Sequence, residues 1–140
     1  MKTIGITGGV GAGKSTVLAY LEEKYNAFVI QADEVGHIVM APGQECYQPV
    51  IDLFGKDVIK NDKTIDRKQV SDVVFGNELM RQSLDAIIHP AVKTYILEEI
   101  RKQRQAGCRL LVIEAALLLE EHYEEFCNNV WYIPVSYTHL

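Results

Sequence analysis

The stretch Thr3–Thr16, TIGITGGVGAGKST, decides the fold expected for this chain. Its apolar start, Ile4-Gly5-Ile6, predicts a short buried strand, and the residues after Lys14 follow a helical pattern. Between them, four residues complete the pattern G-x-x-x-x-G-K-[ST] of a phosphate-binding loop: Gly8, Gly13, Lys14 and Ser15. The alternative is a glycine-rich turn that matches by chance. It is disfavoured because the loop mechanism requires this strand before it and this helix after it.

The residue types of the loop suit phosphate chemistry. Glycines let successive backbone N–H groups turn inward and form a concave anion site, because no Cβ blocks the approach. The N-terminus of the next helix adds free N–H groups and a positive dipole end, Lys14 reaches the β- and γ-phosphates, and the Ser15 hydroxyl coordinates Mg²⁺. We therefore expect a nucleoside triphosphate to contact eight successive residues: Gly9, Val10, Gly11, Ala12, Gly13, Lys14, Ser15 and Thr16. The motif alone does not say which molecule receives the phosphate.

Composition limits the class of protein. The chain has 140 residues, enough for one domain with its own core, and 48% of them are hydrophobic. A net charge of −5 and the lack of a basic run disfavour a nucleic-acid-binding surface. No signal peptide and no stretch of transmembrane length are recognisable, so we expect no membrane contact. Three widely separated cysteines predict reduced, buried thiols in a cytoplasmic protein: Cys46, Cys108 and Cys127.

The residues after the loop continue an α/β pattern. Apolar positions at helical spacing predict a helix that packs on the sheet: Val17, Leu18, Leu21 and Tyr25. The apolar run Ala27–Ile30 predicts a second strand, so strand, helix and strand form a βαβ unit with parallel pairing and a right-handed crossover. In such sheets ligands bind beyond the carboxyl ends of the strands. Asp33, which follows the second strand, is therefore expected to face the same crevice as the phosphate loop.

Asp33 has two interpretations that its position leaves open. A carboxylate in this crevice is a candidate general base, which accepts the proton of an attacking hydroxyl or holds Mg²⁺ through water. Alternatively, Asp33 is only the N-cap of a helix that starts at Glu34, since aspartate favours that position.

Residues 44–106 are predicted to be almost entirely helical. Helices are expected from Tyr47 to Gly55, after the caps Asp66 and Asn77, and from Pro90 to Gly107, with a break at His89-Pro90. No linker composition marks a domain boundary. We therefore expect one domain, with a core formed by residues 1–41 and 107–135 and an inserted helical substrate-binding region at about 42–106.

Two further strands complete the predicted sheet. Leu110–Ile113 is wholly apolar, as central parallel strands are, and Val130–Ile133 forms a fourth strand. Glu114 ends the third strand and has the place of the acidic metal-side residue of phosphate-loop proteins, although a polar residue at a strand end is a common alternative. His37 and His122 lack ligand-like partners at helical spacing, so zinc binding is not expected.

The ordered series of motifs resembles the dephospho-CoA kinase family, from Met1 to about Ile133. Thr7–Thr16 matches its T-G-G-x-G-[SA]-G-K-S-T loop, and Gln31-Ala32-Asp33 matches its D-A-D with the first Asp replaced. The remaining matches follow in order along the chain: Pro42-Gly43, Phe54-Gly55, Ile65-Asp66-Arg67, Val74-Phe75, Ile88-His89-Pro90 and Ala116–Glu120.

The resemblance implies a three-layer phosphate-loop NTPase fold and a cytoplasmic enzyme of coenzyme A biosynthesis. It implies transfer of the γ-phosphate of ATP, with Mg²⁺, to the ribose 3′-hydroxyl of dephospho-CoA. It implies Asp33 as the base, acting with Lys14, and contacts to the acceptor from four residues: Thr7, Asp33, Arg67 and His89. The rival interpretations are a kinase with a nucleoside-type acceptor and a nucleotide-binding module without transfer activity. The oligomeric state is not predicted.

Departures from the family pattern accompany the resemblance. Gln31 removes a carboxylate, His37 stands where the family often has Arg, and Ala116 replaces Pro. Family members also continue well past residue 140 with an arginine-bearing lid, whereas residues 136–140 do not resemble that continuation. We therefore expect the C-terminal part of the fold to be missing from the printed sequence, the tail 136–140 to be foreign to it, and transfer by this chain to be poor.

Overall fold

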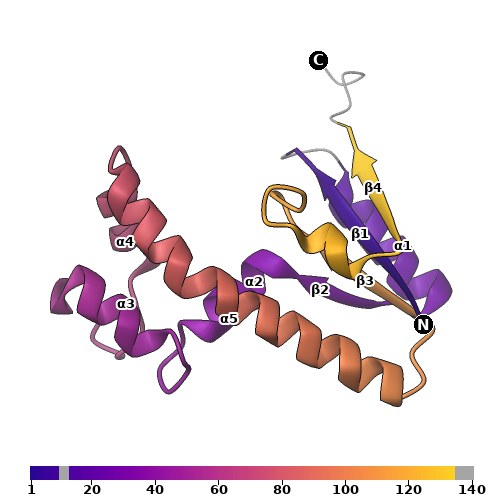
Figure 1. Cartoon of the computed structure of the whole chain (residues 1–140), viewed down its shortest axis with the longest axis horizontal. Coiled ribbons are helices and arrows are strands. Elements are labelled where there is room, and N and C mark those ends of the chain that lie inside the picture. The colour runs from indigo at the N-terminus through magenta and orange to yellow at the C-terminus, as the bar shows by residue number, and fades with distance from the viewer. Residues whose placement is uncertain (10–12, 135–140) are drawn as a thin grey trace. The chain divides into compact units, whose positions relative to one another are not determined.

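The structure, a computed structural model, describes residues 1–9 and 13–134. Four strands form one sheet in this part of the chain: β1 (Lys2–Gly8), β2 (Phe28–Gln31), β3 (Leu110–Glu114) and β4 (Asn129–Ile133) (Figure 1). The α-helices are α1 (Lys14–Tyr25), α2 (Ala32–Val39), α3 (Tyr47–Phe54), α4 (Arg67–Val74) and α5 (Glu78–Gln105). Two 3₁₀ helices are η1 (Lys56–Val58) and η2 (Tyr123–Phe126).

The chain divides into two compact units. The first unit joins Met1–Asp33 to Tyr95–Leu140 and contains the whole sheet. The second unit, Glu34–Thr94, is helical apart from turns and one isolated bridge between Ile59 and Ile65. Helix α5 supplies residues to both units.

The sheet is parallel throughout, which confirms the α/β expectation, but its order is β2-β3-β1-β4. The prediction that the first two strands pair with each other is therefore wrong. Strand β3 lies between β1 and β2 and pairs with both. Its residues Leu111, Val112 and Ile113 are fully buried, which suits a central strand covered on both faces. A βαβ pattern predicts that its two strands run parallel, but it does not predict whether a later strand lies between them.

Helix α1 covers one face of the sheet. Ile4 and Ile6 of β1 and Val112 of β3 form a buried cluster with Leu18 and Leu21 of α1. Burial of a leucine side chain of this kind contributes about 2 kcal/mol. Leu18 and Leu21 are two of the four residues that the helical spacing predicted to pack on the sheet. A third, Val17, is partly buried against the same cluster.

Tyr25 was expected on the same packed face and is instead 55% exposed. It is the last residue of α1, and the next residue, Asn26, ends the helix in the left-handed conformation with φ 54°. The Tyr25 ring makes an edge-on contact with the Tyr20 ring, at a centroid distance of 6.0 Å. The helix therefore ends at its fourth predicted apolar position, and the ring there contacts Tyr20 instead of the sheet.

The opposite face of β1 contacts the segment between β3 and β4. A Cβ at Gly5 would lie 2.9 Å from the Cys127 Sγ and 3.0 Å from the Leu118 Cδ1. Glycine therefore allows the buried Leu118 to approach the strand closely. The three thiols are free, but only Cys46 is buried, so the expectation of buried cysteines is wrong for Cys108 and Cys127.

The helix caps predicted in the second unit are present. The Asp66 side chain accepts a hydrogen bond from the Gln69 N–H at 3.2 Å, and the Asn77 side chain accepts one from the Met80 N–H at 3.1 Å. Each satisfies one of the N–H groups that lack a partner in the first turn of a helix.

The helix break predicted at His89-Pro90 is wrong. Helix α5 runs without interruption from Glu78 to Gln105, with Pro90 inside it (Figure 1). An interior proline costs about 3 kcal/mol because one helical hydrogen bond is lost. The two residues after it, Ala91 and Val92, are 5% and 2% exposed, and their burial offsets part of that cost.

Across residues 1–9 and 13–134, no helix combines the length and the apolar character needed to cross a membrane.

We expect Gly8→Ala to lower the free energy of unfolding by about 3 kcal/mol, because the added methyl group cannot be accommodated without moving backbone. A Cβ at Gly8 would lie 2.3 Å from the Ile133 carbonyl oxygen, on the neighbouring strand β4. Urea denaturation measures the loss.

Gly43→Ala is the matched control for this substitution. Gly43 has φ +85°, and no atom of the described residues lies near enough for its Cβ to contact. Alanine there costs only the left-handed conformation, about 1 kcal/mol. Equal losses in the two variants would contradict the argument that close approach of β4 requires glycine at position 8.

Candidate active site

The carboxyl ends of the strands meet at one edge of the sheet, in the first unit. Glu114 at the end of β3 is in register with Ile6 of β1 and Gln31 of β2, and Gly8 is in register with Ile133 at the end of β4. From β1 the chain crosses to β2 on one side, whereas from β3 it continues to β4 on the other. The crevice between β1 and β3 is therefore the switch point of the sheet, where ligands bind in folds of this kind.

Lys14 and Glu114 form an ion pair at this switch point. The Lys14 Nζ lies 2.9 Å from the Glu114 Oε1, and the two side chains are only 16% and 11% exposed. Lys14 is the first residue of α1, and Glu114 is the last residue of β3. The sequence singled out both residues, yet it did not predict that they would contact each other.

Thr7 joins the end of β1 to the loop that follows β3. The Thr7 hydroxyl donates a hydrogen bond to the Ala116 carbonyl at 3.1 Å, and the Ala115 N–H donates one to the Ile6 carbonyl. Thr7 itself is 8% exposed. These bonds hold the first residues after Glu114 against β1, at the position where the chain has Ala in place of the family's Pro.

The phosphate loop is partly described. Val10, Gly11 and Ala12 lie outside the described residues, so their predicted contacts with nucleotide stay predictions. Gly13 has φ 77° and stands before the first turn of α1. Glycine suits this left-handed position, since other residues pay a steric cost there.

Three further residues of the predicted loop are described: Gly9, which follows β1, and Ser15 and Thr16, which lie at the start of α1. Gly9 is half-buried, whereas Ser15 and Thr16 are exposed in the first turn of α1. The Ser15 hydroxyl and the carboxylates of Asp33 and Glu114 are hard oxygen ligands, the type that suits Mg²⁺. Among the described residues, no three or more His, Cys, Asp or Glu side chains are grouped to hold a metal ion, so coordination of Mg²⁺ by Ser15 stays a prediction.

Asp33 lies in the first turn of α2, two residues after the end of β2, and is exposed. Because α2 begins at Ala32, Asp33 is inside the helix, and the alternative that it caps a helix starting at Glu34 is wrong. A negative charge in a first turn is favoured by the helix dipole. The side chain is accessible at the carboxyl end of the sheet, as a residue that meets a substrate must be.

Tyr123 is a buried residue near this edge that the sequence did not single out. It is 4% exposed and starts η2. Burial, together with smaller contributions from the negative charges of Glu121 and Asp33, raises the pKa of the Tyr123 phenol to about 12. A single tyrosine in an irregular segment carries no sequence signal that would have identified it.

Arg67 contacts His37 within the second unit. The Arg67 guanidinium donates a hydrogen bond to the Nδ1 of His37, and the Glu34 Oε2 lies 3.7 Å from the same nitrogen. Arg67 is the first residue of α4 and is exposed. Arg67 is therefore a first-turn residue of α4 that is also hydrogen-bonded to His37.

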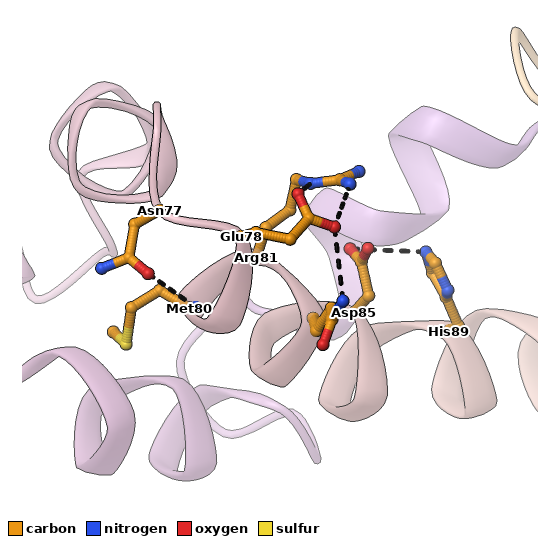
Figure 2. Close-up of polar contacts among 7 residues, drawn as sticks. Asn77, Glu78, Met80, Arg81, Asp85 and His89 are labelled. Atoms are coloured by element: carbon orange, nitrogen blue, oxygen red, sulfur yellow. Dashed lines mark hydrogen bonds and ion pairs between the residues drawn. The ribbon is translucent and has the colours of Figure 1, made fainter.

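His89 belongs to a row of polar side chains along α5 (Figure 2). The His89 Nε2 lies 3.6 Å from the Asp85 Oδ1, and one turn earlier Arg81 makes two hydrogen bonds to Glu78, at 2.6 and 3.1 Å. Such contacts between residues three or four positions apart support the helix locally. Among the predicted site residues of this unit, Arg67 therefore pairs with His37, and His89 lies beside Asp85.

Comparison with known proteins points to one family. The sequence profile of the dephospho-CoA kinase family matches residues 2–139. A dephospho-CoA kinase of Shouchella clausii is 36% identical over 133 residues, which are 95% of this chain and 67% of that protein. A dephospho-CoA kinase of Dehalococcoides mccartyi is 38% identical over 133 residues, which are 95% of this chain and 66% of that protein.

Solved structures agree with the sequence comparison. A Thermus thermophilus protein superposes with a TM-score of 0.78 at 26% identity, over 94% of this chain and 64% of that one. The dephospho-CoA kinase from Campylobacter jejuni superposes with a TM-score of 0.72 at 26% identity, over 93% of this chain and 66% of that one. The chain thus spans about two thirds of the length of the relatives it matches.

The raised pKa of Tyr123 predicts a pH dependence of stability. In the unfolded chain the phenol ionises near pH 10, whereas in the folded chain it stays neutral to about pH 12. The stabilisation is complete below pH 10 and is lost as pH rises through 12, since the unfolded state binds fewer protons in this window. We expect the free energy of unfolding to fall by about 2 kcal/mol more in the unchanged chain than in Tyr123→Phe between these pH values.

Urea denaturation across this pH range measures the difference between the unchanged chain and Tyr123→Phe. As a second readout, Asp33→Asn removes one of the negative charges that raise the Tyr123 pKa, so the loss of stability should end at lower pH and be smaller in total. Parallel pH profiles in the unchanged chain and in Tyr123→Phe would contradict the assignment.

Proposed function

The chain belongs to the dephospho-CoA kinase family, and from this we propose that it transfers the γ-phosphate of ATP to the ribose 3′-hydroxyl of dephospho-CoA. This reaction is the final step of coenzyme A biosynthesis, and we propose that it takes place in the cytoplasm. The observation that carries the proposal is the edge of the sheet where Lys14, Glu114 and Asp33 follow the ends of three neighbouring strands. A phosphoryl donor and a hydroxyl acceptor can be held there side by side.

On the donor side, the chain's own residues bind and neutralise the phosphates. Lys14 and the N–H groups at the start of α1 favour negative charge, and Gly9–Thr16 would surround the β- and γ-phosphates. The Ser15 hydroxyl would hold Mg²⁺, which supplies charge neutralisation on the β- and γ-oxygens. Phosphoryl transfer needs little covalent chemistry from the protein, so positioning and electrostatics carry most of the rate.

On the acceptor side, Asp33 would accept the proton of the attacking ribose hydroxyl. An exposed carboxylate two residues beyond β2 is placed for contact with a ligand at the sheet edge. Thr7 lies at the end of β1, but its hydroxyl is already bonded to the Ala116 carbonyl, so we propose that it orients the loop after β3.

We propose that the second unit, Glu34–Thr94, is the core of the helical substrate region expected at about 42–106. Arg67 with His37 offers a cationic donor for an acceptor phosphate, since a guanidinium presents several N–H groups in a fixed fork. His89 offers an imidazole on α5, in contact with Asp85.

We expect Lys14→Ala to abolish transfer and to weaken ATP binding, because a charge-assisted contact to the transferring phosphoryl group is lost. Such a contact contributes several kcal/mol, about 3 or more, to stabilisation of the transition state. Lys24→Ala, in the last turn of the same helix, is the control and should leave both unchanged. Turnover and ATP affinity are measured with dephospho-CoA, with adenosine and without acceptor. Near-normal turnover in Lys14→Ala, or equal turnover with adenosine, would count against the proposal.

We expect Asp33→Asn to leave ATP affinity nearly unchanged and to lower turnover with dephospho-CoA by about 10²- to 10⁴-fold, the usual contribution of a general base. Asparagine keeps the shape of the side chain and loses the proton acceptor. Asp72→Asn, an exposed change of the same kind on α4, serves as the control. If turnover falls less than tenfold in a folded Asp33→Asn protein, Asp33 is not the base.

A further inference from the structure

We infer that Glu114 and the nucleotide phosphate compete for Lys14: Glu114 holds Lys14 until ATP binds and is displaced from Lys14 by the phosphate. The inference rests on the proposed function, since it assumes that the loop binds ATP. In this arrangement Glu114 positions Lys14, and through Lys14 it lowers the affinity for nucleotide. The observation behind it is the ion pair of 2.9 Å between Lys14 and Glu114.

Of the two partners, Lys14 is the one that can move. The backbone of Glu114 is paired with Ile6 on one side and with Gln31 on the other, and the next residue, Ala115, is bonded to the Ile6 carbonyl. The carboxylate is thus carried by the most constrained part of the sheet. The Lys14 ammonium stands on a flexible four-carbon stem at the start of a helix, so a small rotation of this stem exchanges its partner.

The two anions compete for one cation. In the described part of the chain, Lys14 is the only cationic side chain in an ion pair with Glu114, and the residue beside Glu114 on β2 is the neutral Gln31. Both members of the pair are nearly enclosed, at 16% and 11% exposure. In such surroundings a charge strongly prefers a partner, so Lys14 leaves Glu114 only for another anion.

Glu114 is expected to oppose the binding of ATP in two ways. Moving Lys14 to a phosphate breaks an enclosed ion pair, and it leaves a carboxylate near the polyphosphate. Each opposes binding of free ATP, so Glu114 should lower the affinity of the loop below that of a loop with an unpaired lysine. When one interaction is coupled to another in this way, the affinity typically changes by a factor of about 5 to 150.

The test measures the affinity for ATP in the presence of a chelator, so that no divalent metal contributes. We expect Glu114→Gln to bind ATP about tenfold more tightly than the unchanged chain, within the usual range of such couplings. Glu114→Asp keeps the charge on a side chain one methylene shorter and should bind with intermediate affinity. Glu22→Gln removes an exposed carboxylate on α1 and should bind as the unchanged chain does.

Stability without nucleotide is the second readout. Glu114→Gln and Lys14→Met should each lower the unfolding midpoint in urea, and the double variant should lose less than the sum of the two, because an enclosed charge without a partner is then absent. A merely structural role of Glu114 would lower stability and ATP affinity together. The exchange of partners predicts lower stability with higher affinity. If Glu114→Gln alone does not fold, Glu114→Asp and the double variant carry the test.

The outcomes separate this inference from the proposed function. If the unchanged chain binds ATP with Mg²⁺ but Glu114→Gln and Glu114→Asp bind free ATP no more tightly than it does, the exchange is overturned and the kinase proposal stands. Additive stability losses in the double variant would overturn the exchange as well. If the unchanged chain does not bind ATP with Mg²⁺, both the proposed function and the exchange fall.

Discussion

The parallel pairing of β1 with β3 is the constraint on which the candidate site depends. It aligns Ile6 with Glu114 and brings the phosphate loop, which follows β1, next to the carboxylate that ends β3. Strand β1 is also approached closely at two of its glycines. Gly5 admits Leu118 on one face and Gly8 admits the backbone of β4 at the strand's end. Gly8, the first glycine of the phosphate-loop pattern, therefore also serves the packing of the sheet.

The charge of Lys14, at the carboxyl edge of the sheet, is balanced by an ion pair with Glu114. An enclosed lysine costs several kcal/mol, of order 3–5, when its partner is removed, so an empty phosphate loop needs an anion of its own. Glu114 supplies that anion, while the neutral Gln31 beside it avoids a second carboxylate in the same row. Asp33 remains exposed, and its negative charge acts on the phenol of Tyr123 instead. The same few electrostatic contacts thus affect both the stability of the site and the binding that we propose for it.

The helical unit follows local rules more closely than the sheet does. Caps at Asp66 and Asn77 start their helices as side-chain chemistry predicts. The exception is α5, in which Pro90 should have started a new helix and instead lies inside one. A proline removes one hydrogen bond, and burial of the next two residues, Ala91 and Val92, offsets part of that loss.

The sequence by itself determined the phosphate-loop motif, the parallel strands, most of the helices, the place of Asp33 after β2, and the family. Each depends on residues close together in the chain, where spacing and side-chain type are sufficient. Only the tertiary structure decided that β3 lies between β1 and β2, that Lys14 is paired with Glu114, and that Tyr123 is buried within reach of Asp33's charge. These contacts join residues far apart in sequence, and they follow from strand order and burial, which no local pattern encodes.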